Sequence, residues 1–372
     1  MAGSWLRVRE MVHKEMRQLL RDPRSRAMIF VAPVIQLVMF GYAVNTDIRD
    51  TATIVVDHDR SAESRALVDA FTATGYFEIV AWGERPADLV EALDHGDAVL
   101  GVEIPAGFSR ALARGTATVQ VVVDGTNSNT ATVAQGYANR ITQRFALDRL
   151  AAQGGQPPAV DLRSRAWYNP NLESRAYNVP GVIGLIVLMM SLLLTALAVV
   201  RERELGTLDQ LMVSPLSAAE FMMAKTLPVA LIGLVDLAVI SAVAIFWFDI
   251  PMRGSPVSLV PAALLYILAG LGFGLLISSI SKTQQEAFMA MFLFLLPSII
   301  LSGFFYPLSS MPRVFQWLTL FNPVRHFLEI VRAIFLKGEG IAGLWPQYLA
   351  LSLMAAASLG AAVRRLPRTL GA

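Results

Sequence analysis

The sequence has no cysteine, few histidines and little charge. Because none of the 372 residues is cysteine, disulfides, thiol catalysis, cysteine-ligated zinc and iron–sulfur clusters are excluded. The four histidines are scattered without zinc-ligand spacing, so no metal site is predicted. Charged residues make up 16% and apolar residues 55%, against about 25% and about 45–50% in soluble domains. This composition favours a membrane protein, and the formal charge of +2 does not indicate a nucleic-acid partner.

Sequence patterns for nucleotide binding and for catalysis are absent as well. The chain has no Gly-x-x-x-x-Gly-Lys-Ser/Thr loop to hold phosphates. The nearest glycine cluster, Gly270, Gly272 and Gly274, lies in an apolar run, where glycine commonly permits close helix packing. No Ser/His pair, paired carboxylates or metal-ligand set falls at membrane depth. We therefore expect a chain that binds no cofactor and is not an enzyme by itself.

Six apolar runs are long enough to cross a hydrocarbon core of about 30 Å at 1.5 Å per helical residue. They predict an α-helical integral membrane protein with six transmembrane helices. The runs are Ala27–Val44, Val179–Val200, Thr226–Phe248, Ser258–Ser278, Ala287–Phe305 and Leu344–Val363.

Basic residues in the short flanks of these runs predict the orientation, because Lys and Arg resist translocation. Fourteen lie on the side of the N-terminus and five on the other, which places both termini in the cytosol. A long basic leader without a small-residue cleavage site favours an uncleaved anchor. The predicted order is a cytosolic amphipathic helix (1–26), the first span (27–44), an external domain (45–178), spans two to six (179–363) with a cytosolic connection at 201–225 and an external region at 306–342, and a cytosolic tail (364–372).

The predicted external domain, with 12 arginines and 17 acidic residues, has a mixed α/β pattern. Three aspartates, Asp57, Asp59 and Asp124, fall at strand ends. They fit either a carboxylate site or solvated loop caps, and the caps are favoured because no partner base or ligand set accompanies them. Strands are predicted at Thr53–Val56, Phe77–Ala81, Ala98–Ile104 and Thr118–Val123, and helices at Ser61–Thr74 and Thr130–Gln153.

The first 21 residues predict a basic amphipathic helix that Asp22-Pro23 ends. Its apolar residues recur at spacings of three and four, and basic residues occupy the other faces. Such a helix can lie in the membrane interface with its apolar stripe in lipid. A contact surface for a cytosolic partner is equally compatible with the pattern. The stripe consists of Trp5, Val8, Val12, Met16 and Leu19.

The cytosolic connection after the second span contains two capping boxes, the S/T-x-x-E/Q spacing that begins helices. The first pairs Thr207 with Gln210, and the second pairs Ser217 with Glu220. They predict a short surface helix at Leu208–Val213, and a second helix that runs into the third span. A short charged helix on this face suits mechanical coupling to another subunit.

Several of these features occur together in one family. The residues 201–211, Arg-Glu-Arg-Glu-Leu-Gly-Thr-Leu-Asp-Gln-Leu, resemble the corresponding run in permease subunits of ABC-2 type transporters. So do Tyr168-Asn169-Pro170, Asn322-Pro323, the Ser281–Ala287 loop and the large domain after the first span. The chain is most similar to the branch found in bacterial multidrug-type exporters, and the resemblance covers nearly its whole length.

The resemblance implies a function and partners. It implies half of a translocation path for hydrophobic or amphiphilic compounds in the bacterial inner membrane, with ATP and Mg²⁺ on a separate ABC ATPase subunit. It also implies a second permease protomer, identical or similar, and an external membrane-fusion adaptor. The residues that it assigns to ATPase coupling are Arg201, Glu202, Arg203, Glu204, Gly206, Thr207, Leu208, Gln210 and Leu211.

Two further regions carry candidate functional residues. Asp236, in the middle of the third span, is costly there and is predicted to face protein or water. It either lines the transport path or couples to a cation, or it forms an interhelical hydrogen bond, for which Gln36, Ser191 and Thr195 are candidates. In the external region, Asn322 and Pro323 predict a helix start.

The resemblance makes this external region a re-entrant gate. Glu329 and Arg332, at a spacing of three, could form an ion pair there with a role in the gate. An ordinary helix-surface pair, which contributes only a few tenths of a kcal/mol to stability, is the favoured interpretation. An exporter subunit is the leading functional hypothesis. The alternative is a subunit that relays ATPase motion to an external partner without transporting substrate.

Overall fold

The computed structural model describes residues 2–44, 50–152, 167–169, 173–206 and 217–370. The chain divides into two units, Thr46–Arg165 and a unit made of Met1–Asn45 with Ala166–Ala372. The predicted external domain extended to residue 178, whereas the residues from Ala166 onward group with the helical unit. The last residues of the predicted domain, 174–178, belong to the helix of the second predicted span, which begins at Ser174.

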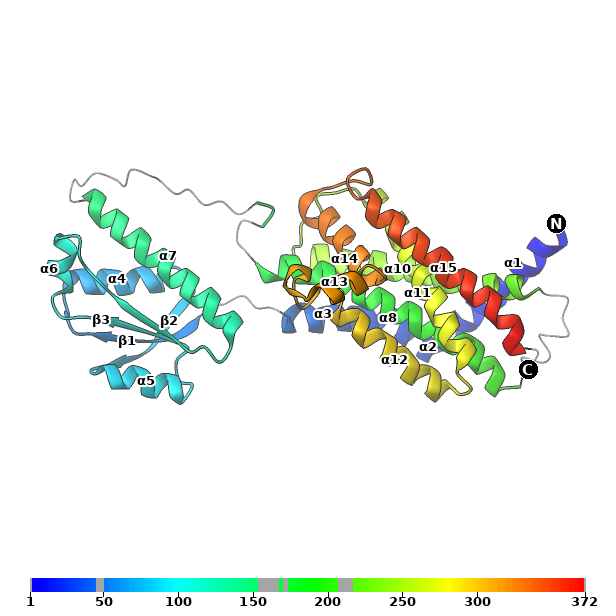
Figure 1. Cartoon of the computed structure of the whole chain (residues 1–372), viewed down its shortest axis with the longest axis horizontal. Coiled ribbons are helices and arrows are strands. Elements are labelled where there is room, and N and C mark those ends of the chain that lie inside the picture. The colour runs from blue at the N-terminus through cyan, green and yellow to red at the C-terminus, as the bar shows by residue number, and fades with distance from the viewer. Residues whose placement is uncertain (1, 45–49, 153–166, 170–172, 207–216, 371–372) are drawn as a thin grey trace. The chain divides into compact units, whose positions relative to one another are not determined.

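The helical unit contains most of the α-helices of the chain (Figure 1). Its described elements are α1 (Ala2–Arg21), α2 (Pro23–Arg26), a π-helical turn (Ala27–Val31), α3 (Ala32–Ala43), α8 (Ser174–Glu204), α10 (Ala218–Phe246), α11 (Pro256–Ile280), α12 (Gln284–Ile300), a 3₁₀ turn (Leu308–Ser310), α13 (Arg313–Thr319), α14 (Pro323–Arg332), a second π-helical turn (Ala333–Lys337) and α15 (Trp345–Leu370).

Four of the described helices are long and apolar enough to cross a membrane. They correspond to the predicted second, third, fourth and sixth spans, and they confirm a helical membrane protein. The other two predicted spans appear as shorter apolar helices, Ala27–Ala43 and Gln284–Ile300. The count of six spans therefore stays a prediction.

Glycines allow close packing around α11, as the sequence predicted. A Cβ atom at Gly272 would overlap the side chain of Ser358 on α15, and one at Gly274 would lie 2.8 Å from the Cβ of Thr195 on α8. Helix α8 runs through the middle of this unit (Figure 1), and most of its length belongs to the buried core. The glycine cluster is thus a packing feature of the spans.

The α/β unit is built on a four-stranded sheet. The strands are β1 (Thr51–Asp57), β2 (Phe77–Gly83), β3 (Leu100–Ile104) and β4 (Gln120–Val123), in the order β2-β1-β3-β4. Strand β1 pairs in parallel with β2 and β3, and β3 pairs antiparallel with β4. All four predicted strands are confirmed, with shifts of a few residues at their ends.

Helices cover both faces of this sheet. One face packs against α4 (Ala62–Thr72), α6 (Phe108–Ala113) and α7 (Ser128–Ala152), and the other packs against α5 (Pro86–Asp94). The two helices predicted here are confirmed as α4 and α7. Ser61 caps α4 by accepting a hydrogen bond from the N–H of Ser64 at 3.1 Å.

The three aspartates at the strand ends are loop caps, as favoured from the sequence. Asp59 accepts hydrogen bonds from the backbone N–H groups of Gly107 and Ser109 at 2.8 and 3.0 Å. Together with a hydrogen bond from the Ser61 side chain, which is the largest influence, these bonds lower the pKa of Asp59 to about 2. Asp57 and Asp124 accept backbone N–H groups of their own loops.

Candidate functional site

The candidate site lies where α1 packs beside the end of α8 and the start of α10. Helix α1 buries Val8, Met11 and Glu15, and Met11 joins a cluster with Phe221 and Met222 of α10. The apolar stripe predicted from the sequence includes Val8, and it was expected to face either lipid or a cytosolic partner. The buried face is rotated from that stripe because it contains a carboxylate that has a partner inside the protein.

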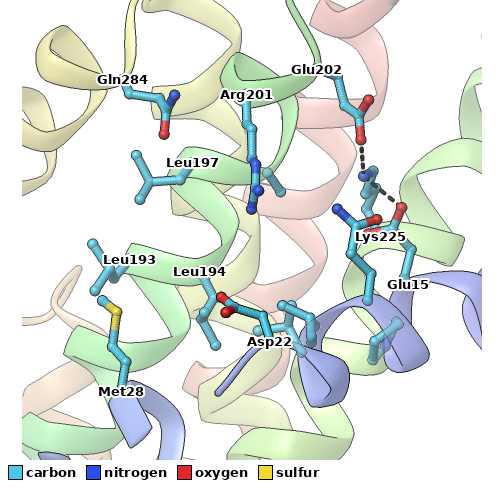
Figure 2. Close-up of a pocket in the computed structure, with 15 residues that line it drawn as sticks. Glu15, Asp22, Met28, Leu193, Leu194, Leu197, Arg201, Glu202, Lys225 and Gln284 are labelled. Carbon is cyan, nitrogen blue, oxygen red and sulfur yellow. Dashed lines mark hydrogen bonds and ion pairs between the residues drawn. The ribbon is translucent and has the colours of Figure 1, made fainter. Parts of the chain in front are cut away.

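That partner is Lys225 of α10, whose side chain is only 5% exposed. Its Nζ donates to Glu15 Oε1 of α1 at 2.7 Å and to Glu202 Oε1 of α8 at 2.8 Å. Figure 2 shows the ammonium group between the two carboxylates. A buried ammonium group requires such partners, because removing a charge from water is costly unless it is paired. One cation therefore joins three helices.

A second ion pair fixes the other end of α1. The Arg7 guanidinium donates to Glu220 Oε1 at 2.9 Å. Glu220 Oε2 accepts from the backbone N–H of Ser217 at 2.7 Å, and the N–H of Glu220 donates to Ser217 Oγ at 3.2 Å. The predicted capping box at the start of α10 is thus confirmed, and Glu220 has a second role as the partner of α1.

Of the remaining residues assigned to ATPase coupling, some are described by the structure and the others lie outside the described residues. Glu204 accepts hydrogen bonds from Gln284, through its backbone N–H at 2.8 Å and its side chain, and Arg203 donates to the Ser281 carbonyl at 2.8 Å. Gly206 adopts φ +68°, which favours glycine, and turns the chain after α8. Thr207, Leu208, Gln210 and Leu211, with the predicted short helix, lie outside the described residues.

A cavity of about 250 Å³ lies beside the Lys225 cluster. Figure 2 shows Leu193, Leu194 and Met28 on one side of it, and the Arg201 side chain extending into it. Small-molecule sites usually measure about 300–1,000 Å³. This cavity is smaller than that range, so the site is better suited to holding helices together than to binding a ligand.

Asp236 lies on the same helix as Lys225 but has different surroundings. It is buried, and its Oδ2 atom has no hydrogen-bond partner among the described residues. The hydroxyl groups of Ser191 and Thr195 each donate to a carbonyl of their own helix and do not supply the predicted interhelical bond. The Oε1 atom of Gln36 also lacks a partner in the described part of the chain.

The region predicted to be external (306–342) has the predicted helix start, but its side-chain pairs differ from the predicted pair of Glu329 with Arg332. Asn322 Oδ1 caps α14 by accepting from the Val324 N–H at 3.0 Å, with Pro323 at the first position. Glu329 forms its ion pair with Arg325 at 3.4 Å. Arg332 instead lies 3.7 Å from the centre of the Tyr177 ring.

Arg332 also reaches the backbone around that ring. It donates to the carbonyls of Tyr177 and Gly303. The start of α8, the end of α14 and the turn after α12 are therefore held together by one guanidinium, a contact for which the sequence gives no local signal.

Among the described residues, no group of three or more His, Asp and Glu side chains is arranged to hold a metal ion. The sequence missed Glu15 and Lys225. Lys225 interrupts the apolar pattern of α10, which is a local signal for that residue, whereas Glu15 lies among the charged residues of α1 and has no such signal.

Comparison with known proteins places this arrangement in a family. The model of the ABC-2 family transporter protein matches residues 23–364, so the chain belongs to the ABC-2 transporter family. Two relatives from Escherichia coli K12 are named probable multidrug ABC transporter permeases: YbhR, 35% identical over 95% of this chain and 96% of its own length, and YbhS, 33% identical over 90% of each. The inner membrane transport permease YhhJ of the same strain is 29% identical over 96% of each chain.

Proposed function

We propose that this chain is the membrane-spanning permease subunit of an ATP-driven exporter. It forms half of a path for hydrophobic or amphiphilic compounds across the bacterial inner membrane, and a separate ABC ATPase holds the ATP and Mg²⁺. Support comes from the two E. coli relatives named as multidrug ABC transporter permeases, which align over at least nine-tenths of this chain, and from the apolar helices.

The observation that carries the coupling role is the attachment of α1 at both ends of one cytosolic segment. Glu202 precedes residues 207–216 and is bound through Lys225 to Glu15 of α1. Glu220 follows the segment and is bound to Arg7 of α1. A partner that pushes on this segment therefore acts at once on α1, α8 and α10. This mechanical link favours the segment as the ATPase-coupling element.

A second protomer fits the exposed apolar surface of two helices. Met39 and Phe40 of α3, and Met289 and Leu293 of α12, are each more than half exposed. Lipid and a second permease, identical or similar, are both suitable neighbours for such surfaces. We propose that the protomer partner covers part of them, and that the α/β unit faces the exterior and docks a membrane-fusion adaptor.

The experiment that tests the coupling role is copurification with an ABC ATPase co-expressed from the same genome. Glu204 and Leu205 are exposed at the end of α8, so the double variant Glu204→Arg with Leu205→Asp changes the surface without entering the Lys225 cluster. Like charges across an interface cost several kcal/mol, which predicts a loss of ATPase recovery of at least about tenfold.

The matched control changes the same residue types on the predicted external side, Glu339→Arg with Ile341→Asp. It should retain the ATPase at the wild-type level. Both variants are first checked for membrane insertion and for a wild-type unfolding temperature. Equal recovery of the ATPase with both inserted variants would remove the end of α8 from the coupling interface.

A further inference from the structure

The α/β unit contains a hollow of about 470 Å³ between α6, the last turns of α7 and the residues that lead into β4. This volume lies inside the range of about 300–1,000 Å³ that is usual for small-molecule sites. The cavity beside Lys225, at about 250 Å³, does not reach that range. The larger of these two recesses is therefore in the α/β unit.

The hollow forms because α7 is longer than the core that it covers. Ala134, Ala138, Ile141 and Phe145 lie buried along one stripe of this helix. Beyond them the helix continues to Ala152, and its last turns carry leucines that the core does not need. Figure 1 shows the end of α7 approaching α6 above the sheet.

The floor of the hollow and much of its wall are apolar. Leu67, Phe108 and Phe145 form the buried floor, and Leu112 lines the wall. Leu150 at the rim is 39% exposed. Exposed leucines at the mouth of an enclosed recess are costly in water, and they are suited to an apolar ligand chain.

The charged residues that line the hollow are both arginines, Arg114 and Arg149. The Nε of Arg114 donates to the carbonyl of Arg110 at 3.2 Å, which holds this side chain at the lip. The guanidinium carbon of Arg149 lies 5.1 Å from the centre of the Phe145 ring on the floor. Residues 45–178 carry 12 arginines and 17 acidic residues, so this region has a net negative charge. The lining of the hollow, with two arginines and no acidic residue, is instead positively charged.

We propose that this hollow binds an amphiphile with one anionic head, a carboxylate or a phosphate, and an apolar tail. The tail lies on Leu67, Phe108 and Phe145, and the head accepts hydrogen bonds from the guanidinium groups of Arg114 and Arg149, which match planar anionic groups in geometry. This site is independent of the proposed ATPase coupling, and its failure would leave that proposal unchanged.

The test is photo-cross-linking of the full chain in nanodiscs of zwitterionic lipid. A palmitic acid analogue with a diazirine on its tail is added, and the labelled peptides are identified by mass spectrometry. We expect label on α6 and on residues 142–150 of α7, with competition by unlabelled palmitate. The matching fatty alcohol, which lacks the charge, should label these peptides about tenfold less.

Two variants separate the head from the tail. Arg114→Glu with Arg149→Glu should reduce the labelling by about tenfold, and Ala146→Trp, which fills the hollow, should abolish it. The matched control is Arg140→Glu with Arg144→Glu, which reverses two exposed arginines of the same helix outside the lining and should label like the wild type. Equal labelling of the two charge-reversed proteins would overturn the proposal.

Two further arms identify the source of the ligand and a competing occupant. A diazirine phosphatidylglycerol in the nanodisc, compared with the free fatty acid, shows whether the headgroup arrives from the bilayer or from solution, and label in the hollow from either supports the site. Residues 153–166 follow α7 directly in the sequence. If the hollow is labelled only after residues 154–165 are deleted, the chain itself occupies it, and the proposal is wrong.

Discussion

Helix α10 buries Lys225 and Asp236, eleven positions apart, in different surroundings. Lys225 is held by two carboxylates from α1 and α8, whereas Asp236 Oδ2 has no hydrogen-bond partner in the described part of the chain. A buried charge that is paired from two other helices fixes their arrangement. A buried carboxylate without a partner is instead available for water, for transported material or for a second subunit.

The difference assigns separate roles to the two halves of α10. Its start is a joint, formed by Lys225 with Glu15 and Glu202 and by Glu220 with Arg7, that connects α1 to the residues on both sides of residues 207–216. Its middle contains Asp236, whose Oδ2 atom has no hydrogen-bond partner among the described residues, and such a cost to stability is commonly found at functional positions. Substitutions at the joint should therefore reduce stability, and substitutions at Asp236 should reduce transport.

The largest expected effect is that of Lys225→Met, which keeps the length of the side chain and removes the charge. Glu15 and Glu202 would then remain close together, mostly buried and without their cation. Removing one partner from a buried ion pair costs about 3–5 kcal/mol. Thermal unfolding in detergent should show a large drop in the unfolding temperature. A variant as stable as the wild type would contradict the joint.

The triple variant Lys225→Met, Glu15→Gln and Glu202→Gln is the control for this prediction. It removes the charges together, and replacing a whole buried ionic group is often nearly neutral. Its unfolding temperature should recover most of the loss. If the triple variant is as unstable as the single one, then packing of the lysine chain, rather than the unpaired charge, determines the effect.

Asp236→Leu should have an effect of the opposite sign on stability. Replacing an unsatisfied buried polar group removes a penalty of about 1–3 kcal/mol, so the unfolding temperature should rise. Export of a lipophilic dye from cells that co-express the ATPase should fall at the same time. Asp236→Asn separates charge from polarity, because it removes the charge and keeps the shape and one accepting oxygen. Wild-type export by both variants would show that the carboxylate has no role in transport.

Local patterns were sufficient to predict much of the fold. The Ser217 and Glu220 capping box, the Asn322 and Pro323 helix start and the four strands follow from residues close in the sequence, and each is present. The joint was not predictable in this way. Glu15 and Lys225 are separated by 210 positions, and only the packing of α1 on α10 brings them together.

The same limit applies to the face that α1 buries and to Arg332. Periodicity identified α1 as amphipathic, but it placed the buried stripe on apolar residues alone and omitted Glu15. A carboxylate on the buried face is consistent with helix packing only when its partner is known. Likewise, the contact of Arg332 with the Tyr177 ring joins residues 155 positions apart, and the nearby Glu329 was the more obvious partner from the sequence.

A smaller effect is expected from removing either acid of the joint alone. Lys225 faces two carboxylates, so Glu15→Gln or Glu202→Gln leaves one cation and one anion, and the glutamine oxygen can still accept a hydrogen bond. The net contribution of one hydrogen bond to a charged group is about 1.5–3 kcal/mol, and the retained amide bond offsets part of it. Each variant should therefore unfold at a temperature between those of Lys225→Met and the wild type. A loss as large as that of Lys225→Met would mean that the two acids are not interchangeable partners.

The smallest effect should come from Arg7→Ala, which breaks the ion pair between Arg7 of α1 and Glu220 of α10. The Arg7 side chain is 42% exposed, and ion pairs that are open to solvent contribute about 0.2–1 kcal/mol. Because salt screens such pairs, the difference from the wild type should shrink at high ionic strength, whereas the Lys225→Met difference should persist. Arg9→Ala, on the exposed face of the same helix, is the matched control and should unfold like the wild type. If Arg7→Ala instead lowered the free energy of unfolding by several kcal/mol at every salt concentration, the Arg7–Glu220 pair would behave like a buried ion pair. The contrast between this pair and the Lys225–Glu15 pair would then no longer hold.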